Sequence, residues 1–221
     1  MSYTRLPITA VACAVLGLSG CGGGGGDIAP APVMTQILSD SSFDGDIEQT
    51  SSTTFTITQG MSPTVQSVYA GIDPVTLTEF RAFLDFPLAG SGGVPGNAVI
   101  QSAFLEIFID DLQPPNGTLP VLIDLVTFQP PTLIATDYDR TAQPSRASTT
   151  ISPPISPGDV GRYVSVDVTS LMIQAQRLQL PDFQVRIMED LGPAIATRIA
   201  IDDSTGANRS ARAPLLTVTY R

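Results

Sequence analysis

Acidic side chains are spaced so that several carboxylates could face one ion. The stretch FDGDIEQT places Asp44, Asp46 and Glu48 at alternate positions, which point to one side of an extended segment. Asp202 and Asp203 end a late apolar alternation, and chain ends often meet in jelly rolls. Calcium prefers six to eight oxygen ligands of this kind. These five residues therefore predict a structural calcium site, with ordinary Asp–Gly turn chemistry as the alternative.

A second candidate site lies on two apolar segments, residues 79–86 and 98–109. If their aliphatic residues face a core, rings and charges share the opposite face, where they can bind sugars or a partner protein. The alternative is that the stretch 137–161 covers the rings while Arg81 pairs with Glu106 across strands. The predicted ligand-binding residues are Arg81, Asp85, Phe104, Glu106 and Phe108.

The residue types that are absent restrict catalysis. The chain has no histidine, lysine or tryptophan, so serine and threonine lack an ordinary side-chain base. Histidine-based zinc sites, Walker-type phosphate loops and Schiff bases are excluded as well. A carboxylate pair such as Asp85 and Glu106 could serve a glycosidase, but only at a defined separation across the scissile bond. We expect no catalytic residues and no enzyme, with a carboxylate-dependent glycosidase as the remaining alternative.

The charge of the chain is strongly acidic, with 21 acidic residues against 11 basic ones. Such a surface repels phosphate backbones, so no nucleic-acid partner is expected. It also disfavours purely electrostatic attachment to anionic lipid. The apolar content of 43% indicates a folded body rather than a disordered tail.

The first twenty residues are typical of a targeting segment. Arg5 supplies its positive charge, and the apolar residues 8–18 are too few to span a bilayer as a helix. The following Leu18-Ser19-Gly20-Cys21 resembles the lipobox of bacterial lipoproteins. This resemblance implies cleavage before Cys21, a lipid anchor on Cys21 and, because Gly22 follows, outer-membrane localisation. An ordinary secretory signal with a free Cys21 is the alternative.

Three segments of the chain are expected. Residues 1–20 form the lipoprotein signal peptide, residues 21–35 a flexible tether rich in glycine and proline, and residues 36–221 a single domain. Cys13 lies in the segment that cleavage removes. The mature chain would therefore have one cysteine and no internal disulfide.

Strand-like alternation recurs along the domain between clusters of Gly, Pro, Asn and Asp. Residues 183–187 are one example, with an apolar face expected inward and a polar face outward. One helix is predicted from Thr169, with Leu171, Ala175 and Leu178 on its buried stripe. The proline-rich residues 137–161 are expected to cross irregularly between sheets. The fold predicted is an all-β, jelly-roll-like antiparallel β-sandwich of about eight to ten strands with one short helix.

Several strand segments together resemble the DNRLRE-type domains, which are jelly-roll modules related to certain carbohydrate-binding modules. The resemblance implies a non-catalytic, surface-displayed module, often beside carbohydrate-active partners. The tryptophans usual in that family are absent, which affects sugar stacking more than the fold. The matching segments are Arg81-Ala82-Phe83-Leu84-Asp85-Phe86, Ala98-Val99-Ile100, Ala103-Phe104-Leu105-Glu106, Asp167-Val168-Thr169 and Pro214-Leu215-Leu216-Thr217-Val218-Thr219-Tyr220.

The sequence therefore predicts a lipoprotein of the bacterial cell envelope, attached to the membrane through Cys21. Its domain is expected to be a non-catalytic binding module for polysaccharide. The alternative is a structural or assembly component whose partner is another envelope protein.

Overall fold

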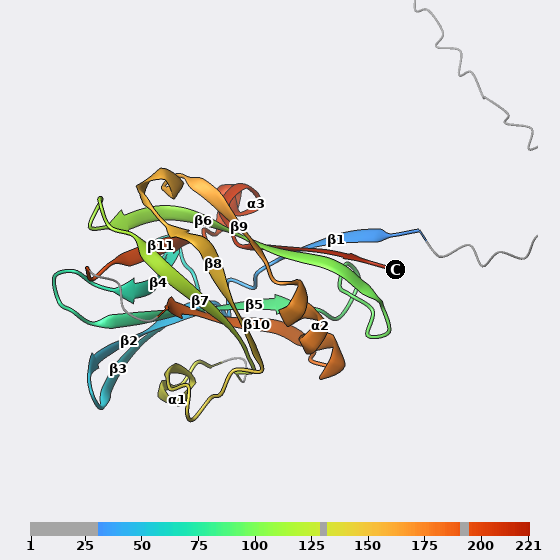
Figure 1. The fold of residues 1–221 in the computed structure, drawn as a ribbon, viewed down its shortest axis with the longest axis horizontal. Helices are drawn as coiled ribbons and strands as arrows, with labels where there is room; N and C mark the ends of the chain where they lie inside the picture. The colour runs from blue at the N-terminus through green and yellow to red at the C-terminus, as the bar shows by residue number, and fades with distance from the viewer. Residues whose placement is uncertain (1–30, 129–131, 191–194) are drawn as a thin grey trace, which may run out of the picture. The chain divides into compact units, whose positions relative to one another are not determined.

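A computed structural model of the chain describes residues 31–128, 132–190 and 195–221 (Figure 1). The predicted signal peptide and residues 21–30 of the predicted tether lie outside the described residues. Residues 33–35 were expected in the tether, but they already belong to the first strand, β1 (Val33–Leu38). There they pair with β12 (Leu215–Tyr220), with Val33 opposite Tyr220.

Strands make up most of the regular structure in the described residues, which confirms the all-β prediction. Helices are short, and two of them, α1 and α3, have only four residues each. Besides β1 and β12 the strands are β2 (Gly45–Ser51), β3 (Thr54–Gln59), β4 (Ser67–Ile72), β5 (Glu79–Pro87), β6 (Ile100–Gln113), β7 (Leu119–Val126), β8 (Ala147–Ile155), β9 (Arg162–Asp167), β10 (Asp182–Glu189) and β11 (Arg198–Asp202). The helices are α1 (Ala135–Tyr138), α2 (Thr169–Arg177) and α3 (Arg209–Arg212), with 3-10 turns at Pro157–Asp159 and Gly206–Asn208.

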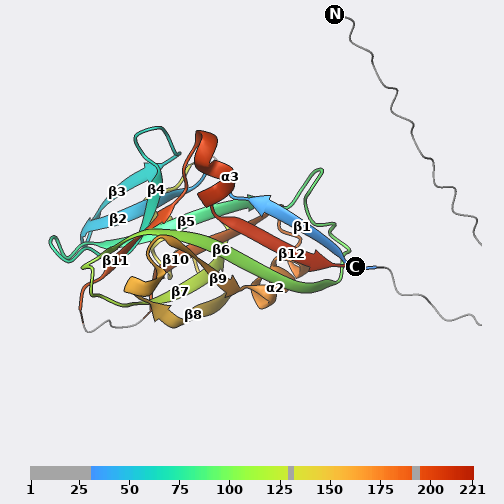
Figure 2. The same ribbon diagram turned by 90° about the horizontal axis from the view of Figure 1, so that it is seen from above.

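The strands form a curled antiparallel sheet in the order β1-β12-β6-β11-β4-β5-β10-β7-β8. Strands β3 and β2 extend it beside β5, and β9 pairs with β6. Strands β4 and β5 pair only briefly, at Gly71 opposite Phe80. This short pairing joins the two halves of the sheet, which end with β4 and begin with β5 in the strand order. Figures 1 and 2 show the two halves facing each other, with β6, β11 and β12 in one layer and β5, β10 and β7 in the other. The result is a β-sandwich, as expected, although with more strands than expected.

One hydrophobic core fills the space between the two layers. Alternate residues of β5, namely Ala82, Leu84 and Phe86, share a buried cluster with residues of β6 such as Leu105 and Ile107. Each fully buried aliphatic or phenyl side chain stabilises the fold by about 1.5–3 kcal/mol relative to exposure. The alternation of these strands therefore fixes which residues are left on the outer faces.

Helix α2 packs on the core where the sequence predicted a helix. Leu171, Met172 and Ala175 are buried, whereas Leu178 is 43% exposed and was wrongly expected on the buried stripe. The helix ends one residue before Leu178, so its side chain leaves the stripe. The backbone N–H of Ala103 donates a hydrogen bond to Thr169 Oγ1 (2.9 Å), which joins the start of the helix to β6.

A second, smaller core covers the outer face of the layer that contains β5. Phe83 packs there with Ile47, Phe128, Leu133 and Tyr138, so residues 132–146 form a lid over this face. Strands β2 and β3 approach each other closely at Gly45, which has no side chain. A Cβ added to Gly45 would lie only 2.2 Å from the carbonyl oxygen of Thr58. Phe83 is therefore covered, as the alternative expected of the outer rings, although the covering segment is residues 132–146 and not 137–161.

Two expectations about this region were wrong. Residues 137–161 are not an irregular crossing, since residues 147–155 form β8 and pair with β7. The polar face of β10 does not meet solvent, because Gln184 and Arg186 are both buried, Arg186 against two lid carbonyls. Alternation shows which residues share a face, but it cannot show whether another segment covers that face.

Among the described residues, no helix has the length and apolar character to cross a membrane.

Candidate functional site

The lid is fixed to the sheet through one fully buried arginine. Arg186 of β10 donates from Nη2 to Asp124 Oδ2 of β7 (2.8 Å) and from Nη1 to the carbonyl of Asp137 (2.8 Å). A further bond reaches the carbonyl of Gln143 (3.2 Å). Both side chains of the ion pair have no solvent exposure. Burial lowers the pKa of the Arg186 guanidinium, and the hydrogen bond and charge of Asp124 oppose that shift.

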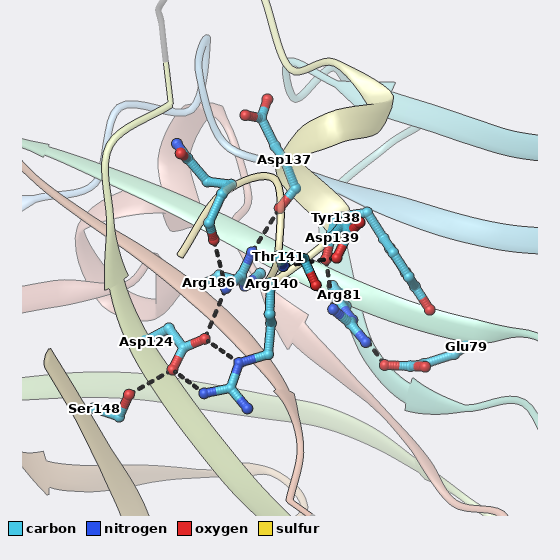
Figure 3. A network of polar contacts seen from close by, with 11 residues as sticks. Glu79, Arg81, Asp124, Asp137, Tyr138, Asp139, Arg140, Thr141, Ser148 and Arg186 are labelled. Carbon is cyan, nitrogen blue, oxygen red and sulfur yellow. Dashed lines mark hydrogen bonds and ion pairs between the residues drawn. The ribbon is translucent and has the colours of Figure 1, made fainter. Parts of the chain in front are cut away.

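Asp124 gathers three side chains at the centre of the network in Figure 3. Besides Arg186 it accepts a hydrogen bond from Ser148 Oγ of β8 (2.6 Å) and lies 3.1 Å from Nε of Arg140. Arg140 belongs to the lid, and its side chain is 47% exposed. Arg140 therefore extends the network from the buried carboxylate of Asp124 to the protein surface.

Arg81 of β5 is held on the other side of the lid. Its Nε lies 2.7 Å from Glu79 Oε1, and its Nη1 donates to the carbonyl of Tyr138 (Figure 3). The guanidinium carbon stands 3.9 Å from the centroid of the Tyr138 ring, a cation–π arrangement. The hydroxyl of Tyr138 donates to Gln49 Oε1 (3.1 Å), and its ring lies 5.2 Å from that of Phe55. Burial raises the pKa of Tyr138, so this hydroxyl remains a donor at neutral pH.

Two surface hollows meet at these arginines, and we call them together the arginine cleft. One has a volume of about 320 Å³ and the other about 300 Å³, and both are lined by Arg81 and Arg140. Volumes of this size are at the lower end for small-ligand sites. The other lining residues are Ile72, Glu79, Leu122, Met188, Glu189 and Asp190 in the first hollow, and Gln49, Ser52, Phe55, Tyr138 and Asp139 in the second.

Chemically, the arginine cleft combines charges with ring surface and amide groups. The half-buried Phe55 offers an apolar ring, and Gln49 and Ser52 supply hydrogen-bonding groups beside it. Arg81 and Arg140 supply fixed donors, because each is already oriented by a carboxylate. Such a surface suits a polar ligand with several hydroxyl groups.

The structure does not bring the five predicted ligand-binding residues together. Arg81 lines the cleft, and Asp85 is buried on the same layer, where Gln184 Nε2 donates to it (2.7 Å). Burial raises the pKa of Asp85 to about 6, although the bond from Gln184 opposes the shift. Phe104, Glu106 and Phe108 lie on β6, which belongs to the opposite layer and does not pair with β5.

The consequence is that the predicted face is really two faces. Arg81 pairs with Glu79 and not with Glu106. The hypothetical catalytic pair of Asp85 and Glu106 is likewise divided between the layers. On the β6 side, Phe108 stacks edge-on against Tyr163 of β9, with ring centroids 5.4 Å apart.

Of the five predicted calcium ligands, Asp44 and Asp203 meet in the interior. Asp44 Oδ1 accepts the backbone N–H of Asp85 (2.7 Å), and Asp203 Oδ1 accepts the hydroxyl of Ser39 (3.3 Å). Arg209 Nη1 lies 3.4 Å from Asp203 Oδ1. Burial and the charge of Asp203 raise the pKa of Asp44, and burial raises the pKa of Asp203 to about 6. Each of the two carboxyl groups therefore affects the pKa of the other.

The other three predicted ligands are used elsewhere. Asp46 accepts the backbone N–H of Tyr69 (3.2 Å), and burial raises its pKa to about 7. Glu48 accepts the hydroxyl of Thr78 (2.8 Å). Asp202 accepts the backbone N–H of Ser204 and lies 3.4 Å from Arg212. In the described ranges, no three carboxylate, cysteine or histidine side chains are grouped as metal ligands would be.

The lid network was missed by reasoning from the sequence alone. Its signal is a single charged residue inside an otherwise apolar strand: Asp124 in VLIDLV and Arg186 in FQVRIM. A charge in such a position is rarely fully buried without a partner. Two strands that each carry one opposite charge therefore indicate a buried ion pair, even when their pairing is unknown.

Comparison with known proteins adds no relative. No model of a known protein family matches the chain, and no curated protein sequence matches it.

Proposed function

We propose that this protein is a lipid-anchored lipoprotein of the bacterial envelope whose β-sandwich binds polysaccharide in the arginine cleft. The localisation is supported by the lipobox-like Leu18-Ser19-Gly20-Cys21, and we expect the outer membrane. A non-catalytic role is supported by the residue types that the chain lacks. The resemblance to DNRLRE-type modules points in the same direction.

The observation that carries the ligand proposal is the fixed position of Arg81. Its guanidinium is held between Glu79 and the Tyr138 ring, and open hollows adjoin it. A donor that is already oriented loses little conformational entropy when it binds a ligand hydroxyl. Phe55, which lines one hollow, supplies the apolar surface on which a sugar ring can stack.

The test is a glycan array probed with the full chain and two alanine variants. Arg81→Ala should lose binding to the glycan class that the unaltered chain recognises, because the variant removes the fixed donor. Glu106→Ala is the matched control: it removes a charged residue from the opposite layer and should bind as before. Equal loss in both variants, or unchanged binding in both, would place the site outside the arginine cleft.

A second candidate function, binding another envelope protein, is favoured by the outer face of β6 and β9. Phe104 and Tyr163 are 40% and 43% exposed there, and aromatic residues are enriched in protein interfaces. This candidate predicts that no glycan binds, while one envelope protein co-purifies with the chain from solubilised membranes. Phe104→Ser should then release that protein, whereas Arg81→Ala should retain it.

A further inference from the structure

One end of the sandwich collects the start of β1, the end of β12, residues 88–99 and the C-terminal part of α2. The backbone N–H of Val99 donates to the carbonyl of Arg221 (2.8 Å), and Thr35 Oγ1 donates to the carbonyl of Gly92. Figure 2 shows β1 beginning beside the end of β12, with α2 close by. We call residues 31–35, 88–99, 176–181 and 219–221 the entry end.

The entry end exposes apolar side chains that the rest of the fold leaves uncovered. Met34 is 67% exposed and Val99 54%, and Val33 and Leu178 are also exposed. These residues come from three separate segments of the chain. Their grouping at one end is therefore produced by the fold and not by one apolar run.

A cavity of about 490 Å³ opens in the same region, and it is larger than either hollow of the arginine cleft. Leu88, Val94 and Met172, all buried, form its apolar wall. Side-chain amide groups also line the cavity, from Asn97, Gln176 and Gln179. The Gln176 amide donates to the carbonyl of Pro95 (3.1 Å). Every residue lining it is uncharged.

Charge distinguishes this end from the remainder of an acidic chain. Residues 31–38, 88–101, 169–181 and 214–221 contain none of the 21 acidic residues. Their charged side chains are those of Arg177 and Arg221. A surface that lies against anionic lipid headgroups must avoid carboxylates, and basic side chains at its edge are attracted to them.

We propose that the entry end rests on the lipid bilayer, with Met34, Val99 and Leu178 in the interfacial region and the uncharged cavity open to a lipid acyl chain. The proposal extends the lipid anchor of the proposed function. Cys21 stands ten residues before Ala31, a span of at most about 35 Å for any extended chain. The anchor therefore keeps this end, with its apolar side chains, near the membrane surface.

Tryptophan fluorescence can test the proposal, since the chain has no tryptophan of its own. Val99→Trp and Leu178→Trp place the probe at the entry end. Val75→Trp is the matched control, because Val75 is an apolar residue, 86% exposed, in the β4–β5 turn at the other end of β5. Each full-length variant is reconstituted into phosphatidylcholine vesicles that contain brominated acyl chains, which quench tryptophan on contact.

We expect at least a twofold drop in emission at positions 99 and 178 and no drop at position 75. Equal quenching at all three positions, or none at 99 and 178, would overturn the proposal. Blue-shifted emission at 99 and 178 without quenching would instead show that a second protein copy covers this end. Mass spectrometry shows separately whether Cys21 carries lipid. An unlipidated Cys21 would contradict the proposed localisation. The quenching at positions 99, 178 and 75 can still be compared in that case, with vesicles added to the protein.

A charge variant examines the same surface independently. In vesicles containing phosphatidylglycerol, Arg177→Glu should weaken association several-fold in low salt, because it places a carboxylate against anionic headgroups. Arg162→Glu changes an exposed arginine of β9, away from the entry end, and should associate like the unaltered chain. Equal association of the two variants would count against bilayer contact at the entry end.

Discussion

The arginine cleft and the entry end of the same sandwich differ in how their side chains are held and in their charge. In the cleft, Arg140 is fixed by Asp124 and Arg81 by Glu79, and the fully buried Arg186 is fixed by the same Asp124. At the entry end the lining of the cavity is uncharged, and apolar side chains such as Met34 are left exposed. Directed hydrogen bonds suit recognition of one polar ligand, whereas apolar area suits a surface without fixed geometry.

The difference also affects what each region contributes to stability. Breaking a buried ion pair leaves an uncompensated charge in a medium of low dielectric constant, which is strongly destabilising. Removing an exposed apolar side chain changes little in the folded state. Mutations of the buried Arg186–Asp124 pair should therefore lower the stability of the fold strongly, and mutations at the entry end should change it little.

The largest effect is expected for Arg186→Met. This variant leaves Asp124 with Ser148 and the partly exposed Arg140 as partners, and it removes the donor that two lid carbonyls accept from. We expect the free energy of unfolding, measured by urea denaturation, to fall by about 3–5 kcal/mol. Adding Asp124→Leu should restore part of that loss, because a well-packed apolar pair replaces the orphaned charge.

Limited proteolysis gives the same prediction a local measurement. Arg140 and Arg146 are trypsin sites within the lid, so release of the lid in Arg186→Met should speed cleavage after both residues. Arg162→Met, an exposed change on the opposite layer, is the control and should alter stability by less than about 0.5 kcal/mol. A lid cleaved at the same rate in both variants would mean that Arg186 does not hold it.

These two regions show how far the sequence could lead. The all-β fold and helix α2 followed from alternation and from the spacing of Leu171 and Ala175, since both record one-sided burial. The approach of Asp44 to Asp203 was anticipated from chain ends meeting in a sandwich. Calcium at that point remains a prediction.

The sequence did not indicate which segment packs against the outer face of each layer. The connection from β5 to β6, residues 88–99, could have formed a hairpin that places Arg81 beside Glu106, and the strand alternation would have been the same. It passes instead to the opposite layer, which separates the predicted binding residues. Burial of Arg186 depends on the lid formed by residues 132–146, and no periodicity of β10 records a distant loop.

A smaller effect on the free energy of unfolding is expected from a change of pH. None of the carboxyl groups involved lines the entry end, so this effect should not arise there. Folding raises the pKa of Asp44, of Asp203 to about 6 and of Asp46 to about 7. The folded state therefore binds more protons than the unfolded state above about pH 4. Stability from these groups is full below that pH and falls as pH rises through 6 and 7, by up to about 1.4 kcal/mol per pH unit for each group.

Denaturation midpoints between pH 4 and 8 measure this slope. Asp44→Asn should flatten it, because the amide keeps an acceptor for the Asp85 N–H and removes a carboxyl group whose pKa is raised by folding. Asp110→Asn, an exposed change, should leave the slope as it is. Repeating the series with calcium and with chelator tests the calcium prediction. If a chelator shifts the midpoint of the unaltered chain but not that of Asp44→Asn, a metal ion binds at Asp44.

The smallest effect on folding is expected for Leu178→Ser at the entry end. Leu178 is exposed one residue beyond α2, so its truncation removes little buried area, and the free energy of unfolding should change by less than about 0.5 kcal/mol. Flotation with vesicles should nevertheless show weaker association, since the lost apolar area is the area that meets lipid. Ile57→Ser, at an exposed apolar residue of β3, is the control for general surface hydrophobicity. If both variants float alike, the entry end is ordinary surface, and the contrast with the arginine cleft reduces to the presence or absence of ion pairs.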